Sequence, residues 1–153
     1  FMMNGALTIG TRDGATIEMA EAAGEENLFL FGLSAEEVAD SRGWYNPQWH
    51  YENEPETRRA LDLIFSDHFS RHEPGAFNPI REALLTHGDY YMHLADLKSY
   101  SETQERLGRL YADSQGWANK AILNVAGSGK FSSDRTIAEY ARDIWRVTPC
   151  PVS

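Results

Sequence analysis

Residues 1–27, FMMNGALTIGTRDGATIEMAEAAGEEN, contain the pattern that decides the fold. Residues 6–11 (ALTIGT) form a short apolar, β-branched run with the length of a buried strand. Asp13 and Gly14 end this run. The Asp13 carboxylate can accept hydrogen bonds from free backbone amides, so Asp13 is a candidate N-cap for a helix that continues to Ala23.

The residues after this helix predict a second strand. Gly24 suits the left-handed position that ends a helix, and the apolar residues 28–31 then close on Gly32. Strand, helix and strand at this spacing predict a βαβ unit, which builds parallel sheets with ligand sites beyond the carboxyl ends of the strands. The loop of residues 10–14 lies at such an end.

Composition bounds the class of protein. The 153 residues, 42% of them hydrophobic, can bury one core, so we expect a single segment over residues 1–153. A net charge of -9 argues against nucleic acid or an anionic membrane as partner, since both attract positive charge. The single Cys150 excludes an internal disulfide framework and fits a reducing cytosol.

The rest of the chain predicts helices with few strands. Ser34 and Glu37 have the spacing of a capping box, and so do Ser99 and Glu102. Further helices are expected over positions, most of them apolar, that follow helical spacing: Leu61, Ile64, Phe65, His68 and Phe69; Phe77, Ile80, Leu84 and Leu85; Tyr100, Gln104, Leu107 and Tyr111; Trp117, Ala121, Ile122 and Val125; Ile137, Tyr140, Ala141, Ile144 and Trp145. Pro149 is expected to end the last of them.

Two stretches of the middle region have less regular patterns. Residues 44–51 hold two Trp and two Tyr around Asn46-Pro47, which predicts an irregular connection packed by aromatic rings, with a sugar-stacking surface as the alternative. Residues 89–97 (DYYMHLADL) alternate between apolar and polar side chains, which favours a short strand.

Candidate chemical sites are weak. Residues 127–130 (GSGK) resemble part of a phosphate-binding loop, but Asn124 replaces its first glycine and Phe131 its Ser or Thr, so a turn between helices explains the glycines better. His68 and His72 have the spacing of zinc ligands on a helix, yet the helix is expected to end there and no third ligand is evident. We therefore expect no metal site, and we assign no catalytic residue.

The loop after the first strand carries the candidate binding residues. Asp13 has a structural role as helix cap and a compatible functional role, which is to shape a loop where the amino end of the helix offers partial positive charge to a phosphate. Gly14 belongs to the same loop. Asn4 and Thr11, which flank the strand, are weaker candidates of the same kind.

Three stretches carry a resemblance to a known family. Residues 4–32, NGALTIGTRDGATIEMAEAAGEENLFLFG, resemble the segment of the α-glucan phosphorylases (glycogen, starch and maltodextrin phosphorylases) that follows the lysine holding pyridoxal phosphate. Residues 128–145, SGKFSSDRTIAEYARDIW, are similar to the C-terminal signature of that family, and residues 43–64 resemble its intervening helical region more loosely. The three stretches occur in the family's order and cover nearly the whole chain.

The resemblance implies an α/β fold, namely the C-terminal portion of the second Rossmann-like domain of GT-B type, with few parallel strands and many helices. It implies an enzyme that cleaves terminal α-1,4 bonds of a glucan with inorganic phosphate and releases α-glucose 1-phosphate. In that family the 5′-phosphate of the cofactor exchanges a proton with the attacking phosphate. The cofactor lysine would immediately precede Phe1, so pyridoxal phosphate is expected in the parent enzyme and not on this chain alone.

Two departures from the family pattern concern the opening loop and helix. Arg12 stands where an apolar residue is usual, and Thr16-Ile17 where Asn-Val is usual, which leaves open any role of that asparagine at the helix start. Two hypotheses follow. The chain is an inactive piece of an active cytoplasmic phosphorylase, which the resemblance implies is a homo-oligomer. Alternatively, it is a non-catalytic, self-associating module with an exposed sheet edge and apolar patches.

Overall fold

The computed structural model describes residues 1–148 and residue 150 of a mainly helical chain. Two short parallel strands, β1 (Ile9–Thr11) and β2 (Phe29–Phe31), form a two-stranded sheet, and α1 (Gly14–Ala23) lies between them in the chain. The predicted α/β class and the order strand, helix, strand are confirmed. β1 is shorter than predicted because the Ala6 amide closes a turn on the carbonyl of Phe1 instead of pairing with a strand.

Two compact units divide the chain. The first unit comprises Phe1–Thr8, Gly14–Phe29 and Leu110–Ser153, and the second comprises Ile9–Asp13 and Leu30–Arg109.

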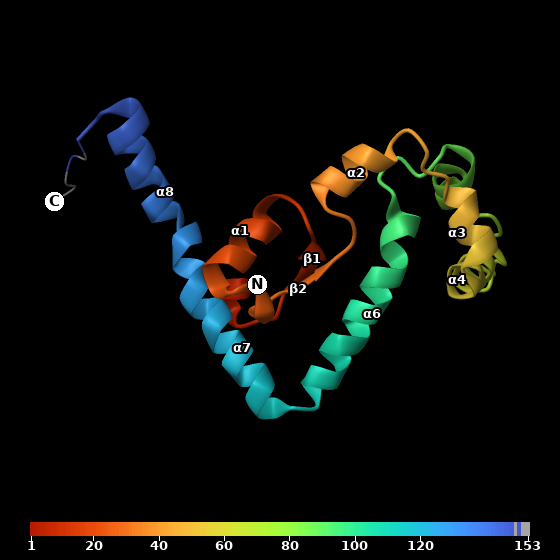
Figure 1. Ribbon diagram of the computed structural model, residues 1–153, viewed down its shortest axis with the longest axis horizontal. Helices are drawn as coiled ribbons and strands as arrows, with labels where there is room; N and C mark the ends of the chain where they lie inside the picture. The colour runs from red at the N-terminus through yellow and green to blue at the C-terminus, as the bar shows by residue number, and fades with distance from the viewer. Residues whose placement is uncertain (149, 151–153) are drawn as a thin grey trace. The chain divides into compact units, whose positions relative to one another are not determined.

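The first unit is built on the pairing of α1 with α7 (Ser114–Gly127), which lie side by side in Figure 1. Its remaining elements are η1 (Met2–Asn4), η2 (Glu25–Asn27), η4 (Ser128–Phe131), α8 (Ser133–Glu139) and the π-helical η5 (Tyr140–Trp145). Asn124 is fully buried in α7, and its amide donates to the carbonyls of Asn27 and Lys120, at 2.8 Å each. This side chain joins α7 to the end of η2.

The glycines of the first unit serve close packing and turns. Gly127 is the last residue of α7, and a Cβ atom built on it would lie 2.9 Å from both the carbonyl oxygen of Ala22 and the Cα of Ala23 in α1. Gly24 has the positive φ expected after α1, 90°, but its ψ of 129° is extended, so the left-handed helical cap predicted there is wrong.

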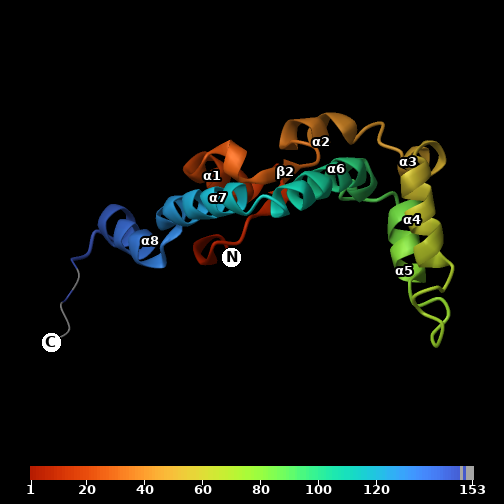
Figure 2. The same cartoon turned by 90° about the horizontal axis from the view of Figure 1, so that it is seen from below.

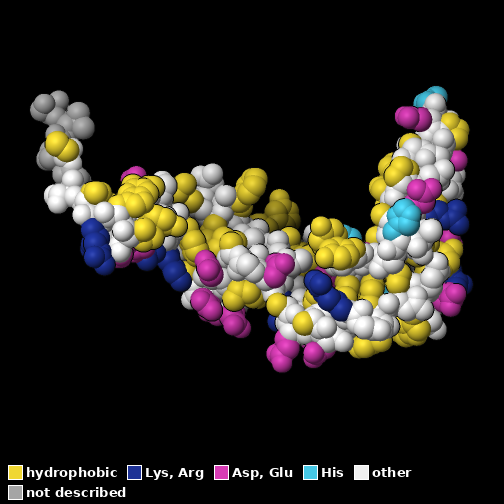
Figure 3. Space-filling view, turned by 90° about the horizontal axis from the view of Figure 1, so that it is seen from above, with side chains coloured by type: hydrophobic (Ala, Val, Ile, Leu, Met, Phe, Trp, Pro, Cys, Tyr) yellow, Lys and Arg dark blue, Asp and Glu magenta, His cyan; other side chains and the backbone are white. Residues whose placement is uncertain are grey.

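Large apolar side chains of the last helices are exposed in this chain. Ile137, Ile144 and Trp145 are 56%, 62% and 55% exposed, and Ile122 in α7 is 65% exposed, whereas helical spacing predicts burial for all four. The helices themselves form where they are predicted. Figure 3 shows hydrophobic side chains on the visible face of the molecule. The predicted burial of Ile122, Ile137, Ile144 and Trp145 is wrong, because no residue described here covers them.

The second unit contains β1, the last two residues of β2 and five α-helices. The helices are α2 (Ala35–Ser41), α3 (Pro47–Asn53), α4 (Pro55–Phe65), α5 (Asn78–Arg81) and α6 (His93–Tyr111). Helix α5 continues into the π-helical η3 (Glu82–Thr86), and the last two residues of α6 belong to the first unit. Figure 2 shows α3, α4 and α5 packed together. The predicted capping box is confirmed at α2, where the Glu37 amide donates to the Ser34 hydroxyl at 3.2 Å and the Ser34 amide donates to the Glu37 carboxylate at 2.8 Å.

Three predictions for the second unit are wrong. Residues 44–51 are not an irregular connection throughout, because the Asn46 side chain accepts from the Gln48 amide and Pro47 occupies the first position of α3. Residues 89–97 form a turn and the start of α6 instead of a strand. Ser99 and Glu102 lie inside α6, so they form no capping box.

Helix α4 ends earlier than its apolar spacing predicts. It stops at Phe65, so His68 and Phe69 lie in the turns that follow, where Asp67 has a positive φ of 60°. Among the residues that the structure describes, no helix has the length and apolarity needed to cross a membrane. Pro149, predicted to end the last helix, lies outside the described residues.

Candidate functional site

The candidate site is formed by the loops that follow the two strands, and all of its residues described below belong to the second unit. β1 ends at Thr11, whose hydroxyl donates to the Asp13 carboxylate at 2.6 Å. Asp13 immediately precedes the first residue of α1, and its role as the N-cap of that helix stays a prediction. Thr11 and Asp13 therefore lie together at the carboxyl end of the first strand.

The loop after β2 is fixed to α6 by two hydrogen bonds. The Leu33 amide donates to the Asp96 carboxylate at 2.8 Å, and the Gly32 amide donates to the Ser99 hydroxyl at 3.1 Å. Gly32 has φ 81°, and a Cβ atom built on it would lie 2.7 Å from the Asp96 carboxylate. Glycine is therefore required at this position both for the backbone conformation and for the approach of the carboxylate.

The electrostatics of this site are acidic. Burial raises the pKa of the Asp96 carboxyl above its ordinary 3.8, and the nearby carboxylates of Asp89 and Asp13 act in the same direction. The Leu33 amide and His93 oppose this shift. The hydrogen bonds of the Ser34 capping box lower the pKa of Glu37, with a smaller contribution from Arg12.

The raised pKa of Asp96 predicts a pH-dependent contribution to stability. The folded chain binds the Asp96 proton more tightly than the unfolded chain, so this contribution is complete below pH 3.8 and is lost as the pH rises through the folded pKa. Asp96→Asn keeps an acceptor for the Leu33 amide. We expect this variant to gain stability relative to wild type as the pH rises from 4 to 7. The expected gain is roughly 0.5 kcal/mol, because the partial exposure of Asp96 screens the effect.

Urea unfolding at several pH values, followed by circular dichroism, measures this difference. Glu102→Gln, at an exposed carboxylate of the same helix, is the matched control. A free energy of unfolding of Asp96→Asn that stays constant or falls relative to that of wild type as the pH rises would contradict the assignment.

The structure separates the four predicted binding residues between the two units. Thr11 and Asp13 lie in the second unit, while Asn4, an exposed residue at the end of η1, and Gly14, the first residue of α1 with φ 48°, lie in the first. The role of all four beside a cofactor stays a prediction.

Sequence reasoning missed Asp96 and Ser99. The signal was present, because residues three apart in a helix face the same side and both side chains can meet one loop. The prediction of a strand over residues 89–97 and of a capping box at Ser99 concealed it.

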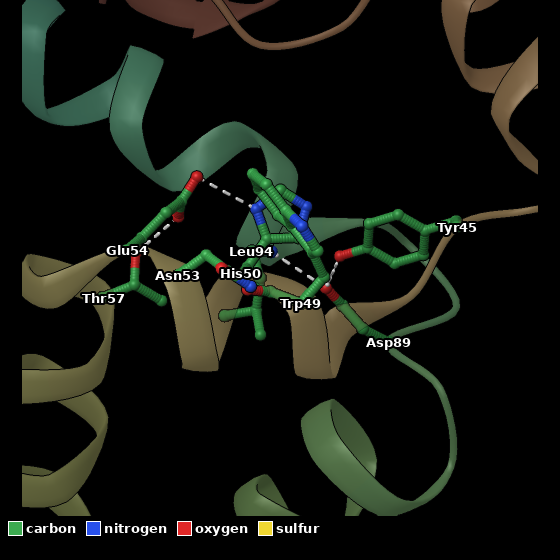
Figure 4. A network of polar contacts seen from close by, with 8 residues as sticks. All are labelled: Tyr45, Trp49, His50, Asn53, Glu54, Thr57, Asp89 and Leu94. Atoms are coloured by element: carbon green, nitrogen blue, oxygen red, sulfur yellow. Dashed lines mark hydrogen bonds and ion pairs between the residues drawn. The ribbon is translucent and has the colours of Figure 1, made fainter.

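A second polar network lies nearby in the same unit (Figure 4). The Tyr45 hydroxyl and the Leu94 amide donate to one oxygen of the buried Asp89 carboxylate, at 2.7 and 2.8 Å. His50 contacts Glu54 at 3.1 Å, and the Thr57 hydroxyl donates to the same carboxylate at 2.8 Å. Together these contacts hold the connection before α3, the start of α4 and the start of α6.

The remaining candidate sites lie in turns and at helix ends. His68 and His72 lie in the turns after α4, and no group of three possible metal ligands occurs within residues 1–148 and residue 150. Gly127, Ser128 and Lys130 belong to the end of α7 and to η4, where Gly127 serves the contact with α1. The sequence predicts a turn between helices for these glycines. Gly129 does lie in the short η4 that follows α7, whereas Gly127 serves helix packing, which was not predicted.

A carbohydrate phosphorylase family model matches residues 1–147, so the chain belongs to the carbohydrate phosphorylase family. Within that family it is similar to the brain-form glycogen phosphorylases of Mus musculus (52% identical over 151 residues) and Homo sapiens (51% over 150 residues). It is also similar to the muscle-form glycogen phosphorylase of Bos taurus (50% over 151 residues). Each comparison covers 97% of this chain and 18% of the relative.

The residues of this chain do not by themselves fit a pyridoxal phosphate site. A Schiff base requires a lysine, and the three lysines of the chain lie in helical elements, Lys98 in α6, Lys120 in α7 and Lys130 in η4. The Lys120 ammonium donates to the carbonyl of Glu26. At the strand ends, the carboxylates of Asp13 and Asp96 would repel a phosphate instead of binding it. No chemical step through the cofactor is therefore assigned to these residues.

Proposed function

We propose that this chain works as the C-terminal portion of an α-glucan phosphorylase of the glycogen phosphorylase type. The parent would cleave terminal α-1,4 bonds of a glucan with inorganic phosphate and release α-glucose 1-phosphate. The observation that carries this proposal is an identity of 50–52% to glycogen phosphorylases over 97% of the chain. Pyridoxal phosphate as cofactor, a cytoplasmic location and a homo-oligomeric state are parts of the same proposal.

The loops at the strand ends suggest what this segment contributes. Asp96 and Ser99 fix the backbone of Gly32 and Leu33, and the Thr11 hydroxyl fixes Asp13. Ligand sites of parallel α/β sheets lie beyond such strand ends, and catalysis by positioning depends on rigid loops there. We infer that Thr11, Asp13 and Gly14 shape the loop beside the cofactor of the complete enzyme, with Asn4 before the strand, and that Asp96 and Ser99 position the neighbouring loop.

A non-catalytic, self-associating module is the second candidate. The exposed apolar side chains of α8 and η5, among them Ile137, Ile144 and Trp145, favour it, because monomeric proteins rarely leave such residues uncovered together. The two candidates differ in that only the first requires the activity of a longer chain.

The test compares this chain with a chain extended to the length of its curated relatives. Glucose 1-phosphate formation from maltodextrin and phosphate, with added pyridoxal phosphate, is expected for the extended chain. We expect about 1,000-fold less for the present chain, because its three lysines lie in helical elements and form no cofactor site. Inactivity of both chains would overturn the phosphorylase proposal and leave the self-associating module, which sedimentation of the present chain would then reveal as an oligomer.

A further inference from the structure

A small polar pocket of about 320 Å³ lies among α3, α4 and the α5–η3 segment, within the second unit. Six of the residues that line it carry the argument: Gln48, Tyr51, Asp62, Phe65, Arg81 and Thr86. Its volume falls at the lower end of the range of small-molecule sites. The pocket lies outside the candidate site described above, and the proposed function does not use it.

Two hydrogen bonds hold the walls of the pocket together. The Tyr51 hydroxyl in α3 donates to the Asp62 carboxylate in α4 at 2.7 Å, and the Gln48 side-chain amide donates to the Leu85 carbonyl in η3 at 3.3 Å. The Arg58 guanidinium lies over the ring of Tyr51, 5.3 Å from the ring centroid. The pocket is thus positioned by contacts between all three helical segments that surround it.

The hydrogen-bonding groups of the pocket suit a neutral polyhydroxyl ligand. Asp62 supplies carboxylate oxygens as acceptors, while the Arg81 guanidinium supplies several donors in a fixed plane. Within residues 1–148 and residue 150, Arg81 forms no ion pair, so its donors remain available to a ligand. One negative and one positive group balance each other, so the site does not select for an anion or a cation.

Amide, hydroxyl and aromatic groups complete this chemistry. The Gln48 amide and the Thr86 hydroxyl can each donate and accept, as sugar hydroxyls require. Tyr51 and Phe65 offer apolar ring surface to the C–H groups of a pyranose. The hydrogen bond from Tyr51 raises the pKa of the tyrosine and holds the Asp62 carboxylate in place.

We propose that this pocket binds one glucosyl unit of an α-glucan through Asp62, Arg81 and Gln48. The choice of an α-glucan among saccharides rests on the proposed function, whereas the saccharide class rests on the pocket itself. Such a site would anchor a glucan chain on the surface made by α3, α4 and the α5–η3 segment.

Hydrogen–deuterium exchange of the extended chain with maltoheptaose tests the proposal locally. We expect slower exchange in peptides covering residues 47–86 when maltoheptaose is added, with the half-saturating concentration raised at least 10-fold in Arg81→Ala and in Asp62→Asn. Asp62→Asn keeps an acceptor for Tyr51, so it leaves the wall contacts in place. Arg59→Ala is the matched control, because Arg59 is an exposed arginine of α4 that pairs with Glu56 at 2.8 Å and does not line the pocket.

Phosphorolysis of maltodextrin, measured on the same samples, separates this inference from the proposed function. Normal phosphorolysis without protection of residues 47–86 would overturn the pocket and leave the enzyme proposal intact. Protection that persists in an inactive protein would support the pocket while refuting the enzyme. Protection by inorganic phosphate alone, or equal loss in Arg59→Ala, would overturn the assignment of a saccharide site.

Discussion

Gly127→Ala is expected to destabilise the first unit by about 2 kcal/mol, although alanine is the better helix former. Exchanging glycine for alanine in a helix ordinarily stabilises a protein by roughly 1 kcal/mol. At Gly127 the new methyl group would lie 2.9 Å from the Ala22 carbonyl oxygen and 2.9 Å from the Ala23 Cα. Both are backbone atoms of α1, so no side chain can rotate away, and α1 and α7 must move apart.

Gly129→Ala is the matched control for this substitution. Gly129 lies two residues further on, in η4, and a Cβ atom built on it has no neighbour within 4 Å. We expect its free energy of unfolding to stay within about 0.5 kcal/mol of wild type. Urea unfolding of both variants at one low protein concentration measures the difference, and equal stability of the two would show that the α1–α7 contact does not limit packing.

Local patterns in the sequence predicted the local structure well. The strands at Ile9–Thr11 and Phe29–Phe31, the helix between them and the Ser34–Glu37 capping box all depend on residues close in sequence. Such features need no knowledge of distant parts of the chain, so a single sequence is enough to predict them.

The failures arise where distant residues decide the structure. Residues 89–97 alternate as a strand does, but the Asp89 carboxylate accepts from the Leu94 amide, and Tyr45, 44 positions earlier, donates to the same oxygen. The contact of Asp96 with Leu33 likewise joins residues 63 positions apart. Helical spacing identified the apolar face of α8 and η5, but spacing cannot say whether another surface covers that face.

Asp89→Ala is expected to destabilise the second unit by about 3 kcal/mol. Asp89 is 2% exposed, so its loss leaves the Leu94 amide and the Tyr45 hydroxyl without their acceptor, and a buried unpaired donor costs about 1–3 kcal/mol. Asp89 also has a positive φ of 46°, which aspartate and asparagine tolerate better than alanine does.

Asp89→Asn separates the lost acceptor from the lost charge. An asparagine keeps one oxygen as acceptor for both donors and tolerates the same φ. Its amide group would replace the second carboxylate oxygen, which has no partner among the described residues. We therefore expect Asp89→Asn to lower the free energy of unfolding by about 1 kcal/mol. Tyr45→Phe removes one donor, and in combination with Asp89→Ala it should cost less than the sum of the two single changes.

The pH dependence of these variants gives an independent measurement. Burial, and next the hydrogen bond to Asp89, raise the pKa of Tyr45 above its ordinary 10, so protonated Tyr45 stabilises the folded chain and this contribution is lost as the pH rises above 10. We expect unfolding curves of wild type between pH 8 and 11 to show this loss and those of Tyr45→Phe to lack it. Asp89→Ala could instead lose as much stability at alkaline pH as wild type does and unfold at the same urea concentration as wild type. The Tyr45–Asp89–Leu94 network would then not hold the start of α6 in place.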